Sequence, residues 1–139
     1  ARIQGKVGTG NNTYAGIGFN FVDPKGPYDA SSYKGVAFYA RAGNDKVTHA
    51  RLKIPDASTD PDGGQCSECF NDFGADIELG VQWRYFEVPF SAMRQMEGWG
   101  SPRPSKIDAS QLYGVQFQVN ASGSEFDLWI DDLVFTGCL

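Results

Sequence analysis

Two stretches near the C-terminus decide the fold class: LYGVQFQVN (residues 112–120) and EFDLWIDDLVF (residues 125–135). In the first, apolar and polar side chains alternate, with Val115, Phe117 and Val119 on one side of the chain and Gln116, Gln118 and Asn120 on the other. Alternation with a period of two indicates a β-strand that has one face on a core and the other in water.

The same alternation recurs along the rest of the chain. It is present in YAGIGFNFV (14–22), KGVAFYARA (34–42), VTHARLKIP (47–55) and WRYFEVPF (83–90), with weaker signals near 2–7 and 75–79. The 17 glycines and 7 prolines of this 139-residue chain supply turns between short strands. We therefore expect an all-β jelly-roll β-sandwich of two antiparallel sheets, with residues 1–139 forming a single domain.

Composition and charge argue against several classes of partner. The net charge of −5 provides no basic surface for nucleic acid or for an anionic membrane, so neither is expected as a partner. His49 is the only histidine, and no G-x-S-x-G motif is present. A catalytic site is therefore the least favoured interpretation, although the separation of two hydrolytic carboxylates is a property of the fold that the sequence does not give.

The cysteines give a modest indication of the compartment. Cys66 and Cys69 form a C-x-x-C pattern inside a polar loop, and Cys138 stands alone near the end. A zinc site usually needs four ligands, which three cysteines and one histidine supply poorly. We expect a structural Cys66–Cys69 disulfide, which favours a secreted, extracellular protein.

One acidic residue breaks the pattern of the last strand. Parity places Asp132 on the apolar side with Ile130 and Val134, where an unpaired carboxylate is costly. A β-bulge could turn Asp132 outward, or a calcium ion could bind it, and both remain open. A second, weaker calcium candidate is the acidic loop DASTDPDGG (56–64), for which a solvated turn is the alternative.

The polar faces of the expected strands carry residues suited to saccharides. A sugar ring can lie against Trp or Tyr through its C–H face, while its hydroxyls suit forked polar groups such as Arg and Gln. Outward positions hold Tyr39, Arg41, Gln116 and Gln118, and Gly16 and Gly18 offer a face without side chains. The alternative is that these residues only solvate the surface, and clustering on one sheet would decide between the two.

Trp99 stands between two glycines in MRQMEGWGSPRP (93–104). The ring could pack over one end of the core or be displayed to a ligand. Flanking glycines and nearby prolines present the ring on a stiff loop, which favours display. Trp129 could form a second platform or be covered by the N-terminal segment, and it is left out of the expected site.

Three motifs carry a resemblance to a known family: QWRYFEVPFS (82–91), LYGVQFQV (112–119) and FDLWIDDLVF (126–135). Together they resemble family 11 carbohydrate-binding modules or close relatives in the galactose-binding-like superfamily. The resemblance implies a jelly roll, a concave face that binds β-linked glucan, attachment to a secreted glycoside hydrolase, and a structural Ca²⁺ held by Asp131 or Asp132.

The resemblance also implies site residues. The loop after P-F-S supplies an arginine and an aromatic residue to the cleft of the family, which correspond here to Arg94 and Trp99, and the penultimate strand contributes Gln116 and Gln118. Tyr14, Tyr39 and Arg41 complete the expected site. We expect a non-catalytic module for β-glucan or a related plant polysaccharide. The alternatives are a protein-interaction β-sandwich without glycan binding and a small glycan lyase or hydrolase.

Overall fold

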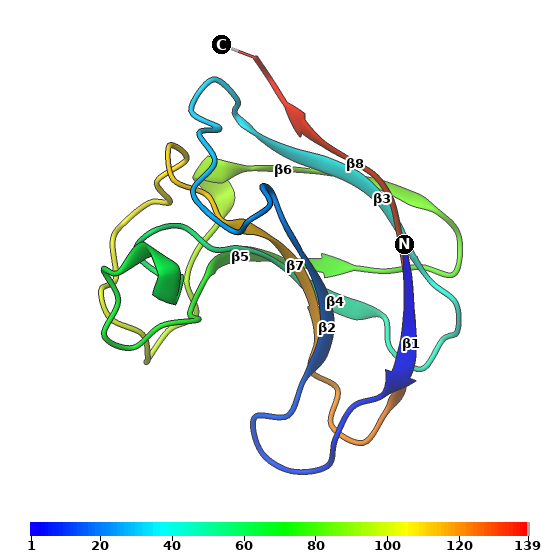
Figure 1. Ribbon diagram of the computed structural model, residues 1–139. Coiled ribbons are helices and arrows are strands. Elements are labelled where there is room, and N and C mark those ends of the chain that lie inside the picture. Colours follow the sequence, from blue (N-terminus) through cyan, green and yellow to red (C-terminus); the bar gives the residue numbers. More distant parts are fainter. Residues whose placement is uncertain (139) are drawn as a thin grey trace.

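The computed structural model describes residues 1–138, which form two packed antiparallel sheets of four strands each (Figure 1). One sheet, with strand order β2-β7-β4-β5, is called the cleft sheet, and the other, with order β1-β8-β3-β6, is called the back sheet. The strands are β1 (Arg2–Lys6), β2 (Ala15–Asn20), β3 (Gly35–Ala42), β4 (His49–Ile54), β5 (Phe73–Glu78), β6 (Arg84–Pro89), β7 (Gly114–Val119) and β8 (Glu125–Thr136). The predicted all-β sandwich is confirmed.

The core lies between the two sheets and consists of the apolar residues of each alternating pattern. Leu52 and Phe117 from the cleft sheet and Phe38 from the back sheet are fully buried. The rings of Phe38 and Phe117 meet edge to face, with centroids 5.0 Å apart, and so join the two layers. Burying a side chain of this size contributes about 1.5–3 kcal/mol, so this interior fixes which face of each strand is turned to solvent.

A β-bulge in β8 places Asp132 outside the core. The register between β3 and β8 shifts so that Asp132 and Leu133 lie opposite the single residue Phe38. Asp132 has φ of 49° and is exposed, while Leu133 packs against the core and Val134 is exposed. The bulge is one of the two alternatives stated from the sequence, and its extra residue reverses the alternation beyond it, so that Val134 does not continue the parity of Ile130.

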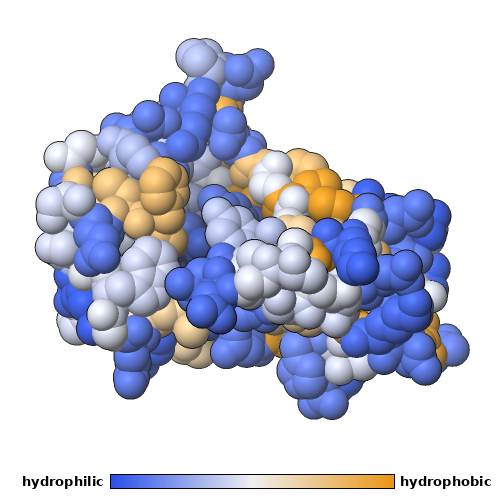
Figure 2. All heavy atoms as spheres, turned by 90° about the horizontal axis from the view of Figure 1, so that it is seen from below, coloured by the Kyte–Doolittle hydropathy of each residue, from blue (hydrophilic) through white to orange (hydrophobic). Residues whose placement is uncertain are grey.

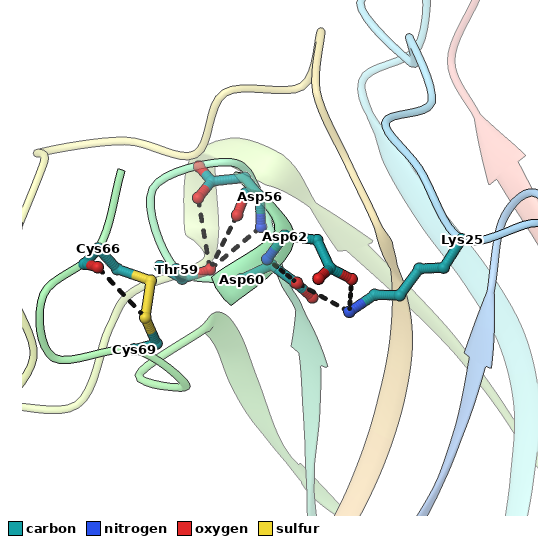
Figure 3. A network of polar contacts seen from close by, with 7 residues as sticks. All are labelled: Lys25, Asp56, Thr59, Asp60, Asp62, Cys66 and Cys69. Atoms are coloured by element: carbon teal, nitrogen blue, oxygen red, sulfur yellow. Dashed lines mark hydrogen bonds and ion pairs between the residues drawn. A yellow bond between two sulfur atoms is a disulfide. The ribbon is translucent and has the colours of Figure 1, made fainter. Parts of the chain in front are cut away.

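The acidic loop 56–64 is neutralised by groups of the chain itself (Figure 3). Buried Asp56 accepts hydrogen bonds from the backbone N–H of Ser58 at 2.9 Å and from that of Asp108 at 2.9 Å. The ammonium of Lys25 lies 2.7 Å from Asp60 Oδ1 and 3.0 Å from Asp62 Oδ2. The loop is therefore an ordered element, in contrast to the solvated turn considered from its sequence.

Helical structure is confined to two short 3₁₀ turns within residues 1–138, Pro61–Gly63 and Phe90–Ala92. No helix in this part of the chain has the length and apolar character needed to cross a membrane.

Candidate binding cleft

Strand register aligns polar side chains into rows across the cleft sheet. Hydrogen-bonded neighbours form two rows, Gly16–Gln118–Arg51–Asp76 and Gly18–Gln116–Lys53–Gly74. Because Val115, Phe117 and Val119 of the same strand are buried, the glutamines between them face away from the core. The rows form a floor of amides and cations that is low at β2, where both residues are glycine.

Loops border this floor on two sides, and together they form a cleft of about 560 Å³. Tyr14 and its neighbours Asn12 and Thr13 line one part, and Phe70, Met96 and Trp99 line another. An adjoining hollow of about 310 Å³ over β2 and β7 shares Tyr14 and Gln118 with the cleft. In Figure 1 the cleft sheet curves so that its hollow side faces the lower left, with the loop before β2 at the bottom and the green and yellow loops at the left.

Trp99 is displayed on a loop that is anchored from below. Buried Asn71 donates from Nδ2 to the carbonyls of Met96 at 2.9 Å and Trp99 at 2.6 Å, and its Oδ1 accepts from the Met96 N–H at 2.9 Å. The Gly100 N–H donates to Glu68 at 2.8 Å, beside the Cys66–Cys69 disulfide. With the backbone held in this way, Trp99 remains 42% exposed at the cleft.

The glycines that flank Trp99 have conformations that favour glycine. Gly98 and Gly100 have φ of 86° and 89°, which lie in the left-handed region. A Cβ at Gly100 would also lie 2.7 Å from the Cβ of Asn71. The sequence G-W-G therefore allows the loop to approach Asn71 closely while its tryptophan points elsewhere.

The charges of the cleft floor are balanced within the chain. Arg51 pairs with Asp76 at 3.1 Å and donates to the carbonyl of Arg94 at 2.6 Å. Lys53 pairs with Asp72 at 3.0 Å and donates to the carbonyl of Phe70 at 3.0 Å. Burial raises the pKa of the Asp72 carboxyl, and Lys53 opposes this shift without cancelling it.

Five of the seven predicted side chains lie on this side of the molecule or at its edge. Tyr14, Trp99 and Gln118 line the cleft, and Gln116 lines the adjoining hollow. Arg94 lies at the edge beside β5, where it bridges to Gly74, and its guanidinium donates to the carbonyls of Ser91 and Met93 at 2.7 Å each. Arg94 is not among the described residues that line the cleft.

Tyr39 and Arg41 do not share a face with the glutamines, and this part of the prediction is wrong. Both lie on β3 of the back sheet, where Tyr39 pairs with Tyr85 and Arg41 lies beside Trp129. Arg41 stacks on the rings of Trp129 at 4.5 Å and Trp83 at 5.4 Å. Period-two alternation gives the outward face of a strand but not the sheet to which the strand belongs.

Trp129 is covered by the N-terminal strand, which was one of its two expected states. The guanidinium of Arg2 lies 4.5 Å from the centre of its ring, on the back sheet.

Sequence reasoning missed most of the other residues that line the cleft, among them the polar residues Arg51, Lys53, Asn71 and Asp72. Arg51 and Lys53 occupy outward positions of a correctly predicted strand, so the signal that selected Gln116 and Gln118 was present for them too. Asn71 and Asp72 precede β5 in a loop with no periodic pattern, so no sequence signal pointed to them.

The two residues expected to hold calcium lie on the bulge of β8. Asp131 Oδ1 accepts a hydrogen bond from the backbone N–H of Asp132 at 3.0 Å, and both side chains are on the exposed face of the bulge. Within residues 1–138, no three His, Cys, Asp or Glu side chains gather as ligands for a metal. The bulge explains the outward position of Asp132 without a cation, and calcium remains an untested prediction.

Comparison with known proteins places the fold in one structural class. No family model and no curated protein matches the sequence. Among solved structures, the family 11 carbohydrate-binding module of the cellulosomal cellulase Lic26A-Cel5E of Clostridium thermocellum is 17% identical, with a TM-score of 0.72 over 99% of this chain and 74% of that one. The chain has the jelly-roll fold of these modules.

Two further structures support the same assignment of fold. A family 11 module from Clostridium thermocellum in complex with a β-1,3-1,4-mixed-linked tetrasaccharide is 17% identical, with a TM-score of 0.72 over 99% of this chain and 75% of that one. A family 30 carbohydrate-binding module is 10% identical, with a TM-score of 0.65 over 96% of this chain and 74% of that one. At these identities the likeness establishes the fold.

Proposed function

We propose that the protein is a non-catalytic carbohydrate-binding module that holds a β-glucan or a related plant polysaccharide in the cleft. The observation that carries the proposal is that two rows of polar side chains on the cleft sheet are bordered by exposed aromatic rings from the adjoining loops. Gln118 and Arg51 stand side by side on the floor, with Tyr14 and Trp99 at the walls.

This arrangement meets both chemical requirements of a saccharide. The exposed rings of Tyr14 and Trp99 can stack on the C–H faces of sugar rings. Gln116 and Gln118 each offer an amide donor and acceptor to hydroxyl groups, from a strand with a buried apolar face. Figure 2, which views the molecule from below Figure 1, shows hydrophilic and hydrophobic residues interspersed on the face seen there.

The paired carboxylates favour binding over hydrolysis. Glycoside hydrolysis generally uses two carboxyl groups that act on the substrate. Of the acidic residues on and beside the floor, Asp72 pairs with Lys53 and Asp76 pairs with Arg51. A binding module of this kind works at micromolar to millimolar affinity, or about −8 to −4 kcal/mol.

The structural neighbours supply the context of the proposal. One family 11 module was solved with a mixed-linked β-glucan fragment, and another belongs to a cellulosomal cellulase. By analogy, we propose a glucan ligand and attachment to a secreted glycoside hydrolase. The Cys66–Cys69 disulfide suits an extracellular location.

Affinity electrophoresis in gels that contain mixed-linked β-1,3-1,4-glucan tests the proposal. We expect the wild type to be retarded and Tyr14→Ala to be retarded less. Tyr85→Ala is the matched control, because Tyr85 is exposed to a similar degree on the back sheet, 55% against 67% for Tyr14. Absence of wild-type retardation by neutral β-glucans, or equal loss in the two variants, would contradict the proposal. A reducing-sugar assay on the same polysaccharide would reveal a hydrolase.

A further inference from the structure

Two cations lie on the floor of the cleft, a feature that the proposed glucan ligand does not explain. Arg51 and Lys53 occupy successive outward positions of β4 and both line the cleft. Their side chains are only 14% and 13% exposed. Unbalanced positive charge at such depth would favour polysaccharides that carry carboxylate or sulfate groups, because electrostatic attraction is strong where water is displaced.

The positive charge of Arg51 is balanced at the edge of the sheet. Its guanidinium extends over β5 toward Asp76 and the carbonyl of Arg94. Gly74 leaves room for this path, since a Cβ there would lie 3.2 Å from Arg51 Nε and 3.3 Å from its Cζ. Arg51 therefore lies along the floor with its charge paired to one side of the cleft.

The positive charge of Lys53 is balanced from beneath. The Asp72 side chain is 1% exposed and lies 3.0 Å from the Lys53 ammonium. Lys53 is the cation that faces this carboxylate, and the Thr59 hydroxyl is a second polar neighbour. A buried carboxylate held in this way contributes little to stability, because the cost of removing it from water offsets the attraction to its partner.

The position of Asp72 beneath Lys53 determines the net charge of the cleft floor. With Asp72 ionised, the residues that line the cleft carry two positive charges and one negative charge, and Asp76 balances the second cation from just outside. The floor is therefore rich in hydrogen-bond donors but close to electrically neutral. Such a surface suits hydroxyl groups and offers no net attraction to anionic groups.

We infer that the cleft selects uncharged polysaccharides over acidic ones and that Asp72 sets this preference by cancelling the charge of Lys53. The inference rests on the proposed function for the nature of the ligand as a glycan. It adds the charge class of that glycan and names a specificity-determining residue. The net charge of −5 acts in the same direction for the whole chain, but only the Asp72–Lys53 pair acts within the cleft.

Two polysaccharides with the same backbone test the inference: mixed-linked β-1,3-1,4-glucan and its carboxymethylated derivative. We expect wild-type protein to bind the neutral glucan at least about tenfold more tightly, a difference of about 1.4 kcal/mol. The Asp72→Asn variant should bind the acidic derivative at least about fivefold more tightly than wild type does, because the positive charge of Lys53 is no longer balanced. This gain should disappear at high salt, which screens the attraction.

Two further variants separate charge in the cleft from other effects. Glu87→Gln removes one negative charge from an exposed position on the back sheet and should leave the ratio of affinities unchanged. Lys53→Gln combined with Asp72→Asn removes both charges and should restore the wild-type preference. A thermal melt of each variant verifies folding.

The outcomes are distinguishable. Equal binding of both glucans by wild type, no gain in Asp72→Asn, or an equal gain in Glu87→Gln would overturn the inference while leaving the proposed function in place. No wild-type binding of either glucan would remove the proposed function and the inference with it.

Discussion

The two outer faces of the sandwich both carry arginines and aromatic rings, but these side chains make different contacts on each face. On the back sheet, Arg41 contacts the rings of Trp83 and Trp129, and Arg2 contacts Trp129 from the neighbouring strand β1. On the cleft sheet, Arg51 pairs with a carboxylate, and the rings at the walls remain exposed. An arginine and a tryptophan on the same outer face therefore do not by themselves indicate a binding site, because the two side chains can be in contact with each other, as Arg41 and Trp129 are.

The shape of the two faces differs as well. Two outward positions of β2 on the cleft sheet, Gly16 and Gly18, are glycine, and loops border the floor. At corresponding positions the back sheet carries large side chains that pack on one another, such as Tyr39 on Tyr85 with ring centroids 5.4 Å apart. The first face is hollowed between loops, whereas on the second the partly exposed rings lie against one another.

The largest expected effect that separates the faces is on glucan affinity. Trp99→Ala should weaken binding by about 2 kcal/mol, or roughly 30-fold, if the ring is a central stacking contact. Trp83→Ala is the matched change, because Trp83 is 44% exposed and Trp99 is 42% exposed. Isothermal titration calorimetry with a glucan oligosaccharide measures both. A loss of affinity in Trp83→Ala as large as that in Trp99→Ala would show that the back sheet binds the glycan too.

A smaller effect is expected on stability, and on the opposite face. Arg41→Ala removes the cation that contacts Trp83 and Trp129 and should lower the free energy of unfolding by about 1–2 kcal/mol. Glucan affinity should not change, since Arg41 lies on the back sheet. Urea denaturation and calorimetry together check both parts. Normal stability with weakened binding would place Arg41 in the site after all.

The smallest expected effect is on stability, through the ion pair between Arg2 of β1 and Asp127 of β8, and it depends on pH. Arg2 Nε and Nη2 lie 2.9 and 2.8 Å from the two oxygens of Asp127, and this contact lowers the pKa of the Asp127 carboxyl. A carboxyl with a lowered pKa in the folded state adds stability above its ordinary pKa, and this stability is lost as pH falls through the lowered value.

Arg2→Ala should therefore lower the melting temperature at neutral pH by less than Arg41→Ala does. The difference from wild type should shrink in acid as Asp127 becomes protonated. Melting curves across this pH range measure the effect. A difference that is independent of pH would assign the role of Arg2 to its contact with Trp129 alone.

Residue patterns predicted the strands and the sandwich because the core imposes strict alternation. They also found Gln116 and Gln118, whose strand has buried residues on either side of each. They could not separate β3 from β7, since both alternate in the same way and only long-range pairing assigns them to different sheets. The pattern left the bulge at Asp132 as one of two alternatives, and the contacts of Asn71 and Asp72 depend on neighbours distant in sequence.

The three tryptophans allow one direct test of where the glycan lies. A ¹⁵N NMR titration with a mixed-linked β-glucan tetrasaccharide resolves their indole N–H signals, which single Trp→Phe variants assign. We predict that the Trp99 signal shifts together with the side-chain amides of Gln116 and Gln118, while the Trp83 and Trp129 signals stay in place. Shifts at Trp83 and Trp129 with Trp99 unchanged would contradict binding in the cleft.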